Sequence, residues 1–168
     1  HRRSSAASDV YKRQALDWTA EVYRAAGQIM EEHGLLQGVA DEGGYWPAFD
    51  TNEAALDNLV AAIERAGLVP GDQVSISLDI AASEFGEAGL YRLGLEEREL
   101  DSDALSDMLV GWTERYPIVS IEDPLGEDDE AGLRKFTAAV GNRIQIIGDD
   151  YLVTNARRVE DAAARGAC

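Results

Sequence analysis

Four carboxylates occupy positions from which they could share a metal ion. Glu42 lies in DEGG, Asp79 in SLD, Glu122 in SIED and Asp149 in IGDD, and each stands at the end of a segment with the pattern of a strand. The separations are 37, 43 and 27 residues, so each is long enough for one strand and one helix. Side chains at the C-terminal ends of parallel strands meet at one mouth of a barrel-like sheet, where we expect these four to gather.

Several carboxylates in one mouth repel each other, and a hard divalent cation relieves that repulsion. Oxygen ligands are those that Mg²⁺ prefers, with water and substrate oxygens in its remaining positions. The chain has one cysteine and two histidines, and they form no cluster with the spacing of a zinc site. The sequence therefore predicts a Mg²⁺ site. The alternative for any single acid is helix capping, which is sufficient to explain Asp41, Asp123 and Asp150.

The elements that must position these acids follow an alternating order. Strand patterns cover residues 36–40, 74–79, 118–123 and 143–150, with a small hairpin near residues 91–93. Apolar residues at helical spacing predict helices between Ala15 and Gly34, Asn52 and Gly67, Ser102 and Pro117, Leu133 and Gly141, and Asn155 and Gly166. Strands that alternate with helices in this way are typical of a parallel sheet. We predict an α/β fold with about four βα units.

The composition limits the classes of partner. The net charge of −17 argues against nucleic acid, because binding to a phosphate backbone needs clustered Lys and Arg. No apolar run approaches the roughly 20 residues that span a membrane, and the N-terminus lacks the apolar core of a secretory signal. The single cysteine, Cys168, cannot form an intramolecular disulfide, which suits a reducing compartment. We expect a cytoplasmic protein with neither nucleic acid nor membrane as a partner.

The first fourteen residues, HRRSSAASDVYKRQ, have no apolar periodicity. Such a segment is expected to be disordered. DVYKRQ also resembles the in-frame translation of an adapter used in transposase-based sequencing libraries, and a scar of this kind does not belong to a fold. We therefore expect residues 15–168 to carry the domain, and residues 1–14 to be a disordered adapter scar.

Five segments, in this order, resemble the signature motifs of the enolase family. They are DEGG at 41–44, LDIAASEF at 78–85, YPIVSIEDP at 116–124, EDD at 127–129 and IIGDDYLVTN at 146–155. The resemblance implies a modified TIM-like (β/α) barrel and the reversible dehydration of 2-phosphoglycerate to phosphoenolpyruvate, with two Mg²⁺. It implies that Asp79, Glu122 and Asp149 bind the tighter Mg²⁺ and that Glu42 helps the hydroxyl group leave. Glu42 and Asp149 are also the residues expected to contact substrate, in a homo-oligomeric parent enzyme.

The chain departs from the family pattern in several respects. The family's general base is a lysine on the strand that would follow Cys168, and neither Lys12 nor Lys135 matches it. The family's N-terminal domain and first barrel strands would precede Ala15. We therefore expect the middle part of an enolase barrel domain, inactive and poorly folded when isolated. Around DEGG, the family's Phe-Ala-Pro-Asn is replaced by residues 45–48, Tyr-Trp-Pro-Ala, which points to a divergent, enolase-like paralogue.

Two alternatives remain open from the sequence. The first is another enolase-superfamily enzyme, such as a racemase or cycloisomerase, that removes a proton alpha to a carboxylate; it shares the three metal ligands and usually differs at DEGG and IIGDD. The second is a non-catalytic, acidic cation-binding module that is complete as it stands. It predicts that the isolated chain folds and that substitution of Glu42 has no chemical effect.

Overall fold

The computed structural model describes residues 3–168, with side chains from Val10 onward. The chain divides into two compact units, one ending at Val74 and the other formed by Ser75–Cys168. Among the described residues, no helix combines the length and the apolar character needed to cross a bilayer.

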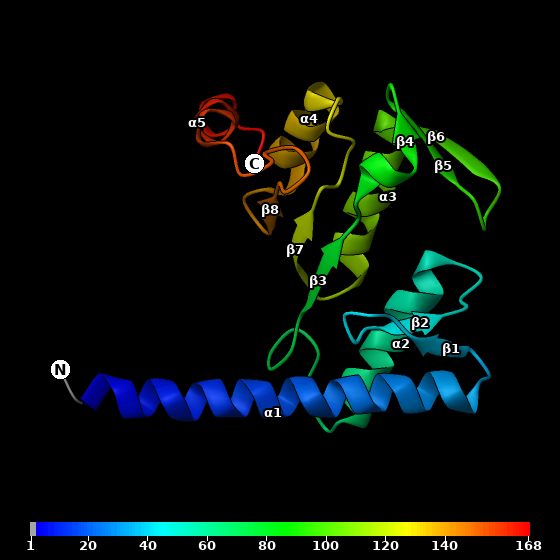
Figure 1. Ribbon diagram of the computed structural model, residues 1–168, viewed down its shortest axis with the longest axis vertical. Helices are drawn as coiled ribbons and strands as arrows, with labels where there is room; N and C mark the ends of the chain where they lie inside the picture. Colours follow the sequence, from blue (N-terminus) through cyan, green and yellow to red (C-terminus); the bar gives the residue numbers. More distant parts are fainter. Residues whose placement is uncertain (1–2) are drawn as a thin grey trace. The chain divides into compact units, whose positions relative to one another are not determined.

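The first unit is built around two packed helices (Figure 1). It contains α1 (Arg3–Glu32), β1 (Leu36–Val39), β2 (Tyr45–Pro47) and α2 (Asn52–Arg65). Its core consists of small and medium apolar side chains on the facing sides of the helices: Ala25, Ala26, Ile29, Met30 and Ala62. Thr51 caps α2 by accepting the N–H of Ala54 at 3.2 Å. Arg65 donates to both carboxylate oxygens of Glu32, at 2.9 and 2.8 Å, and so links the ends of the two helices.

Residues 3–14 form the first turns of α1, whereas the sequence analysis expects a disordered tail there. The side chains from Val10 to Asp17 are all exposed, so this part of the helix depends on local helix propensity rather than on burial. The stretch has no proline or glycine to end the helix, and Ala6, Ala7, Lys12 and Arg13 favour it. His1 and Arg2 lie outside the described residues. The origin of the stretch stays a prediction.

The strand that leads into DEGG differs from its predicted pairing. β1 pairs antiparallel with β2, with Val39 opposite Tyr45, and the two form a hairpin of their own. We expected β1 to be a parallel strand in the same sheet as the later ones. The reason for the difference is local: only five residues separate β1 from β2, and a connection this short joins antiparallel strands.

The second unit holds a parallel sheet in the order β3 (Ile76–Asp79), β7 (Ile118–Glu122), β8 (Gln145–Ile147). Three helices accompany it: α3 (Ser102–Arg115), α4 (Glu130–Val140) and α5 (Ala156–Arg165). Each begins at a side-chain cap, from Asp101, Asp129 and Asn155 respectively. After the short 3₁₀ helix η1 (Ala82–Glu84), an antiparallel sheet consists of β4 (Gly86–Glu87), β5 (Leu90–Leu93) and β6 (Arg98–Asp101).

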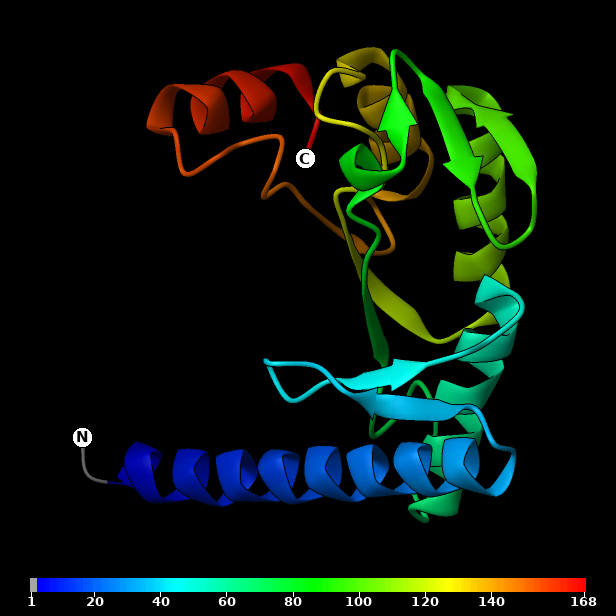
Figure 2. The same ribbon diagram turned by 45° about the vertical axis from the view of Figure 1, so that its right-hand side comes forward.

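Apolar residues between the helices and the parallel sheet form the core of this unit. Large buried side chains of this core are Leu105 and Leu109 of α3, Ile121 of β7, and Leu133, Phe136 and Val140 of α4. α3 packs against both α4 and β7 (Figure 2). The α/β class is confirmed, and the open parallel sheet is consistent with part of a barrel.

Tyr91 joins the antiparallel sheet to the segment that follows β7. Its side chain is 1% exposed, its hydroxyl donates to Asp129 Oδ2 at 3.0 Å, and it accepts the N–H of Gly126 at 2.9 Å. Asp129 also accepts a hydrogen bond from the Ser102 hydroxyl. Burial, partly offset by the Gly126 N–H, raises the pKa of Tyr91 to about 12, so the neutral phenol is the form that the fold favours.

Replacing Tyr91 with phenylalanine is expected to destabilise the protein by about 1–3 kcal/mol, because the buried N–H of Gly126 loses its acceptor. The pKa is raised, so the contribution of the hydroxyl to stability is complete below pH 10 and is lost as the pH rises through about 12. Urea denaturation should therefore show a gap between wild type and variant at pH 7 that narrows in strong alkali. Thr19→Val, which removes an exposed hydroxyl from α1, is the control and should leave stability within about 0.5 kcal/mol of wild type.

Candidate functional site

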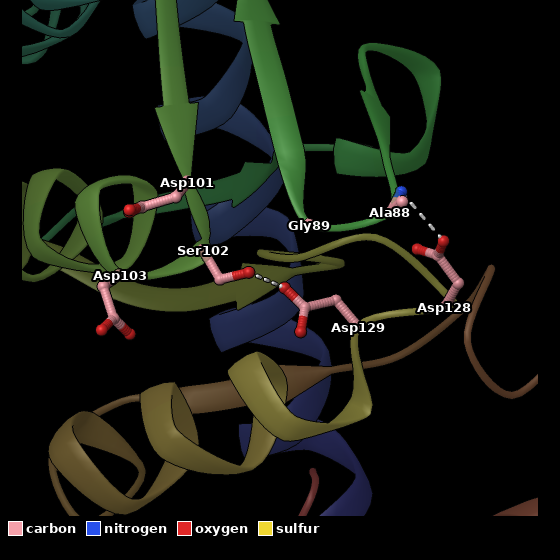
Figure 3. Close-up of a pocket in the computed structure, with 7 residues that line it drawn as sticks. All are labelled: Ala88, Gly89, Asp101, Ser102, Asp103, Asp128 and Asp129. Atoms are coloured by element: carbon pink, nitrogen blue, oxygen red, sulfur yellow. Dashed lines mark hydrogen bonds between the residues drawn. The ribbon is translucent and has the colours of Figure 1, made fainter.

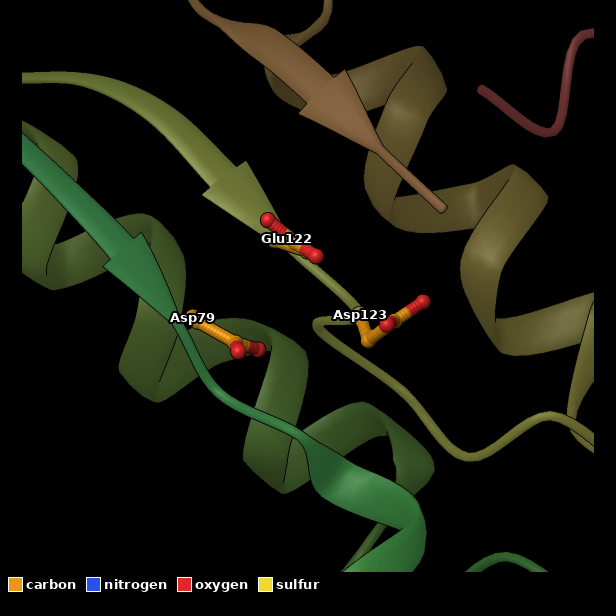
Figure 4. A group of neighbouring side chains, drawn as sticks. All are labelled: Asp79, Glu122 and Asp123. Carbon is orange, nitrogen blue, oxygen red and sulfur yellow. The ribbon is translucent and has the colours of Figure 1, made fainter. Parts of the chain in front are cut away.

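The ends of two parallel strands bring Asp79 and Glu122 side by side. The register of β3 and β7 pairs Asp79 directly with Glu122, and Glu122 pairs with Ile147 of β8. Asp79, Glu122 and Asp123 each offer a carboxylate oxygen, and these oxygens lie within 4.8 Å of one another (Figure 4). Asp79 is exposed, Glu122 is half-buried and Asp123 is buried. The strand ends thus present an acidic cluster that could hold a cation.

The electrostatics of this cluster favour a bound cation. Desolvation raises the pKa of Glu122, and the charges of Asp79, Asp123, Asp149 and Asp150 raise it further. Desolvation also raises the pKa of Asp150, followed by the charges of Asp123 and Asp149. Carboxylates that destabilise each other in this way, with oxygen as their only donor atom, suit a hard divalent ion such as Mg²⁺. The donor set therefore fits the predicted metal.

Asp123 connects the end of β7 to the turn that follows β8. Its carboxylate, 4% exposed, accepts the N–H of Asp149 through Oδ1 at 3.1 Å and the N–H of Asp150 through Oδ2 at 3.0 Å. Its own N–H donates to the carbonyl of Ile147 at 3.0 Å. From the sequence, helix capping was sufficient to explain Asp123, whereas in the structure its carboxylate holds the Asp149 turn in place.

Strand alternation would direct Asp123 to the face opposite Glu122. The backbone breaks that alternation, because Asp123 adopts the left-handed region with a φ of 40°. A sequence pattern carries no signal for such a turn of the chain. The acid directly before Pro124 was the available hint that the strand ends here.

Asp149 lies two residues beyond β8, in an exposed turn. Its carbonyl accepts the N–H of Val153 at 2.7 Å, and the backbone is left-handed at both Val153 and Thr154, with φ of 44° and 54°. Asp149 is not one of the three acids whose oxygens lie within 4.8 Å of one another, although its charge raises the pKa of Glu122. Its place among the metal ligands stays a prediction.

Glu42 lies in the other unit, on the exposed turn between β1 and β2. The turn is closed by backbone hydrogen bonds from Ala40 N–H to Gly44 O and from Gly43 N–H to Ala40 O, both 2.8 Å. The meeting of Glu42 with the strand-end acids stays a prediction.

Two serines lie next to the acids on the same face of the parallel sheet, one pair of residues earlier along β3 and β7. Ser77 and Ser120 precede Asp79 and Glu122 by two residues and share their face of the sheet. Their hydroxyl oxygens are 2.6 Å apart, which fixes the spacing of β3 and β7 just below the acids. The signal in the sequence was the shared pattern of serine two residues before an acid, in SLD and SIED.

A second acidic hollow lies beside the antiparallel sheet (Figure 3). It is lined by Ala88, Gly89, Asp101, Ser102, Asp103, Asp128 and Asp129. Its acids already have partners within the fold: Asp101 and Asp129 cap helices, Asp128 accepts the N–H of Ala88 at 3.1 Å, and Asp103 pairs with Lys135. This hollow is explained by structural hydrogen bonds.

The chain matches one protein family, described as "Enolase, C-terminal TIM barrel domain", over residues 5–168. Two curated relatives are both named "Enolase 2", from Pseudomonas syringae pv. syringae (strain B728a) and Pseudomonas syringae pv. tomato (strain ATCC BAA-871 / DC3000). Each is 42% identical over 148 residues, and the matched region covers 88% of this chain and 35% of the relative. The chain thus spans about a third of the length of these relatives. With a parallel sheet whose ends carry Asp79 and Glu122 in register, and a family match along nearly all of its length, this chain belongs to the enolase family, within its C-terminal TIM barrel domain.

Proposed function

We propose that the full-length protein is a Mg²⁺-dependent hydro-lyase that reversibly dehydrates 2-phosphoglycerate to phosphoenolpyruvate. The observation that supports this most directly is the pairing of Asp79 with Glu122 at the ends of adjacent parallel strands. Asp149 follows the third strand of the same sheet, in the order of the family motif. The substrate would be a small phosphorylated hydroxy acid, and the enzyme a cytoplasmic homo-oligomer without nucleic acid or membrane partners.

We assign metal binding, backbone positioning and proton donation to different residues of the chain. Asp79, Glu122 and Asp149 would hold Mg²⁺, which when bound stabilises the negative charge that develops on a substrate carboxylate. Asp123 keeps the backbone of Asp149 in place. Glu42 would supply the proton that leaves with the substrate hydroxyl as water, a task for a protonated carboxylic acid.

We propose that the proton alpha to the carboxylate is removed by a lysine outside this chain. Lys135 is poorly suited, because its ammonium lies 2.6 Å from Asp103 Oδ1 and that hydrogen bond raises its pKa. A general base works best with a pKa near the operating pH, which needs a shift in the opposite direction. We therefore expect the 168-residue chain alone to be inactive on 2-phosphoglycerate.

Replacing Glu42 with glutamine in the full-length enzyme tests the proposal. Turnover of 2-phosphoglycerate should fall about 10²- to 10⁴-fold, because glutamine cannot deliver a proton, while KM changes little. Asp41→Asn makes the equivalent change one residue away in the same exposed turn and should keep wild-type turnover. The readout is the steady-state formation of phosphoenolpyruvate.

A full-length wild-type enzyme that is inactive on 2-phosphoglycerate but active on another carboxylate would favour the racemase or cycloisomerase alternative. Equal activity of Glu42→Gln and wild type would remove Glu42 from the mechanism.

A further inference from the structure

The turn that carries Glu42 is closed by its own backbone hydrogen bonds, but none of its side chains is buried. Asp41, Glu42, Gly43 and Gly44 are all exposed, and the two backbone hydrogen bonds that close the turn lie within it. Gly43 has a φ of 87°, which a glycine adopts at little cost. Bonds within the turn set its curvature, so its direction must come from contacts with another element of the same unit.

Tyr23 of α1 supplies such contacts. Its hydroxyl donates to the carbonyl of Gly43 at 2.8 Å, directly beside Glu42 in the chain. Its ring stacks on Tyr45, the first residue of β2, with 4.2 Å between the centroids and 10° between the planes. Tyr23 therefore contacts the turn at Gly43, near its tip, and at Tyr45, where β2 begins.

Gly27 makes room for this arrangement. A Cβ at Gly27 would lie 2.3 Å from the Tyr45 hydroxyl oxygen and 2.4 Å from Cζ of the same ring. Gly27 and Tyr23 are one helical turn apart and so lie on the same face of α1. The ring of Tyr45 also packs against the helical core of the unit. Tyr45 thus stacks on the ring of Tyr23 and lies close against the backbone of Gly27.

We propose that Tyr23, Gly27 and Tyr45 form a positioning clamp that aims the Glu42 turn; the inference rests on the role proposed above for Glu42. The clamp residues touch the turn and not the substrate, so they act through Glu42. A misplacement of a reacting group by about 1 Å can cost on the order of 10²-fold in rate, so a clamp that sets the direction of the turn has a measurable effect.

The first test uses Gly27→Ala in the full-length enzyme, because the added methyl group forces Tyr45 to move. Gly111→Ala in α3 is the matched control: Gly111 is also within a helix, and no atom lies within 4 Å of where its Cβ would be. Both changes favour the helix to the same extent. We expect Gly27→Ala to lower kcat about 10- to 100-fold with KM near its wild-type value, and Gly111→Ala to leave both unchanged.

The second readout separates the step that needs Glu42 from the step before it. Breaking the C–H bond alpha to the carboxylate sends its proton to the base, whereas breaking the C–O bond needs a proton for the departing hydroxyl. Exchange of the alpha proton with solvent deuterium should therefore survive in Gly27→Ala while dehydration slows. A parallel loss of exchange and dehydration, or a change confined to KM, would overturn the clamp.

Tyr23→Phe supplies an independent variant that keeps the ring and removes the hydroxyl that donates to the carbonyl of Gly43. Amide hydrogen exchange at Ala40 and Gly43, whose N–H groups close the turn, should be faster in Tyr23→Phe than in wild type or Gly111→Ala. This measurement needs no substrate, so it tests the clamp even if wild type fails to turn over 2-phosphoglycerate, which would count against the proposed function alone. Unchanged exchange in Tyr23→Phe would contradict the clamp.

Discussion

Substituting Glu122 with glutamine is expected to weaken Mg²⁺ binding severely while making the metal-free protein more stable. Loss of a direct ligand should weaken binding by more than the roughly 100-fold that loss of an outer contact costs. The gain in stability has the same origin, because desolvation and four neighbouring carboxylates raise the pKa of Glu122 and so disfavour its charge. The two effects have opposite signs, which distinguishes a metal ligand from a residue that merely supports the fold.

The direction of two pKa shifts determines how the stability of the metal-free protein depends on pH. The pKa values of Glu122 and Asp150 are raised in the fold above their ordinary values of 4.5 and 3.8. Their contribution to stability is therefore complete below those ordinary values and is lost as the pH rises through the raised ones. The part of the stability of the metal-free protein that comes from this cluster should therefore fall as the pH rises above those ordinary values, and Mg²⁺ should restore more of it at pH 7 than at pH 4.

Calorimetric titration with Mg²⁺ and thermal unfolding with and without the metal measure these effects in the full-length protein. Glu160→Gln, at an exposed position of α5, is the matched control and should change neither binding nor stability. Wild-type affinity for Mg²⁺ in Glu122→Gln would exclude Glu122 as a ligand. A lower Tm of the metal-free variant would contradict the repulsion within the cluster.

Replacing Phe136 with alanine is expected to destabilise the protein by about 3–5 kcal/mol. Phe136 lies on α4 and is 1% exposed, so the truncation leaves a cavity within the core of the second unit. Val159→Ala, at a side chain of α5 that is 46% exposed, should stay within about 0.5 kcal/mol of wild type. Chemical denaturation compares the two. A loss below about 1 kcal/mol for Phe136→Ala would show that the site collapses around the smaller side chain.

Apolar periodicity and end signals predicted the helices well. Gly34, Gly67 and Pro117 follow the ends of α1, α2 and α3 within two residues, and Asn155, at the predicted start of the last helix, is the cap of α5. Asp79 and Glu122 could also be placed, because parallel strands put their C-terminal ends at one edge of the sheet. These features depend on local sequence and on the period of the strand or helix.

The features that were wrong or missed depend on the geometry of short turns and on contacts between distant residues. β1 has the pattern of a buried parallel strand, but its partner is decided by the short turn to β2. Asp123 enters the acidic cluster through one left-handed backbone step, and its hydrogen bonds reach residues 149 and 150. The stacking of Tyr23 on Tyr45 joins residues 22 positions apart, which no periodicity marks.

The left-handed backbone at Val153 and Thr154 makes this loop sensitive to whether a cation is bound to the acids. β-branched residues rarely adopt positive φ, and each such residue costs about 1–3 kcal/mol unless its surroundings hold it. Both side chains are exposed. The backbone here is held by the N–H of Val153, which donates to the carbonyl of Asp149, and by the N–H of Asp150, which donates to Asp123. A cation that neutralises the acids would remove the repulsion acting on this loop. Cleavage by a protease, which needs locally extended backbone, should therefore begin here in the metal-free protein and move elsewhere once Mg²⁺ is bound.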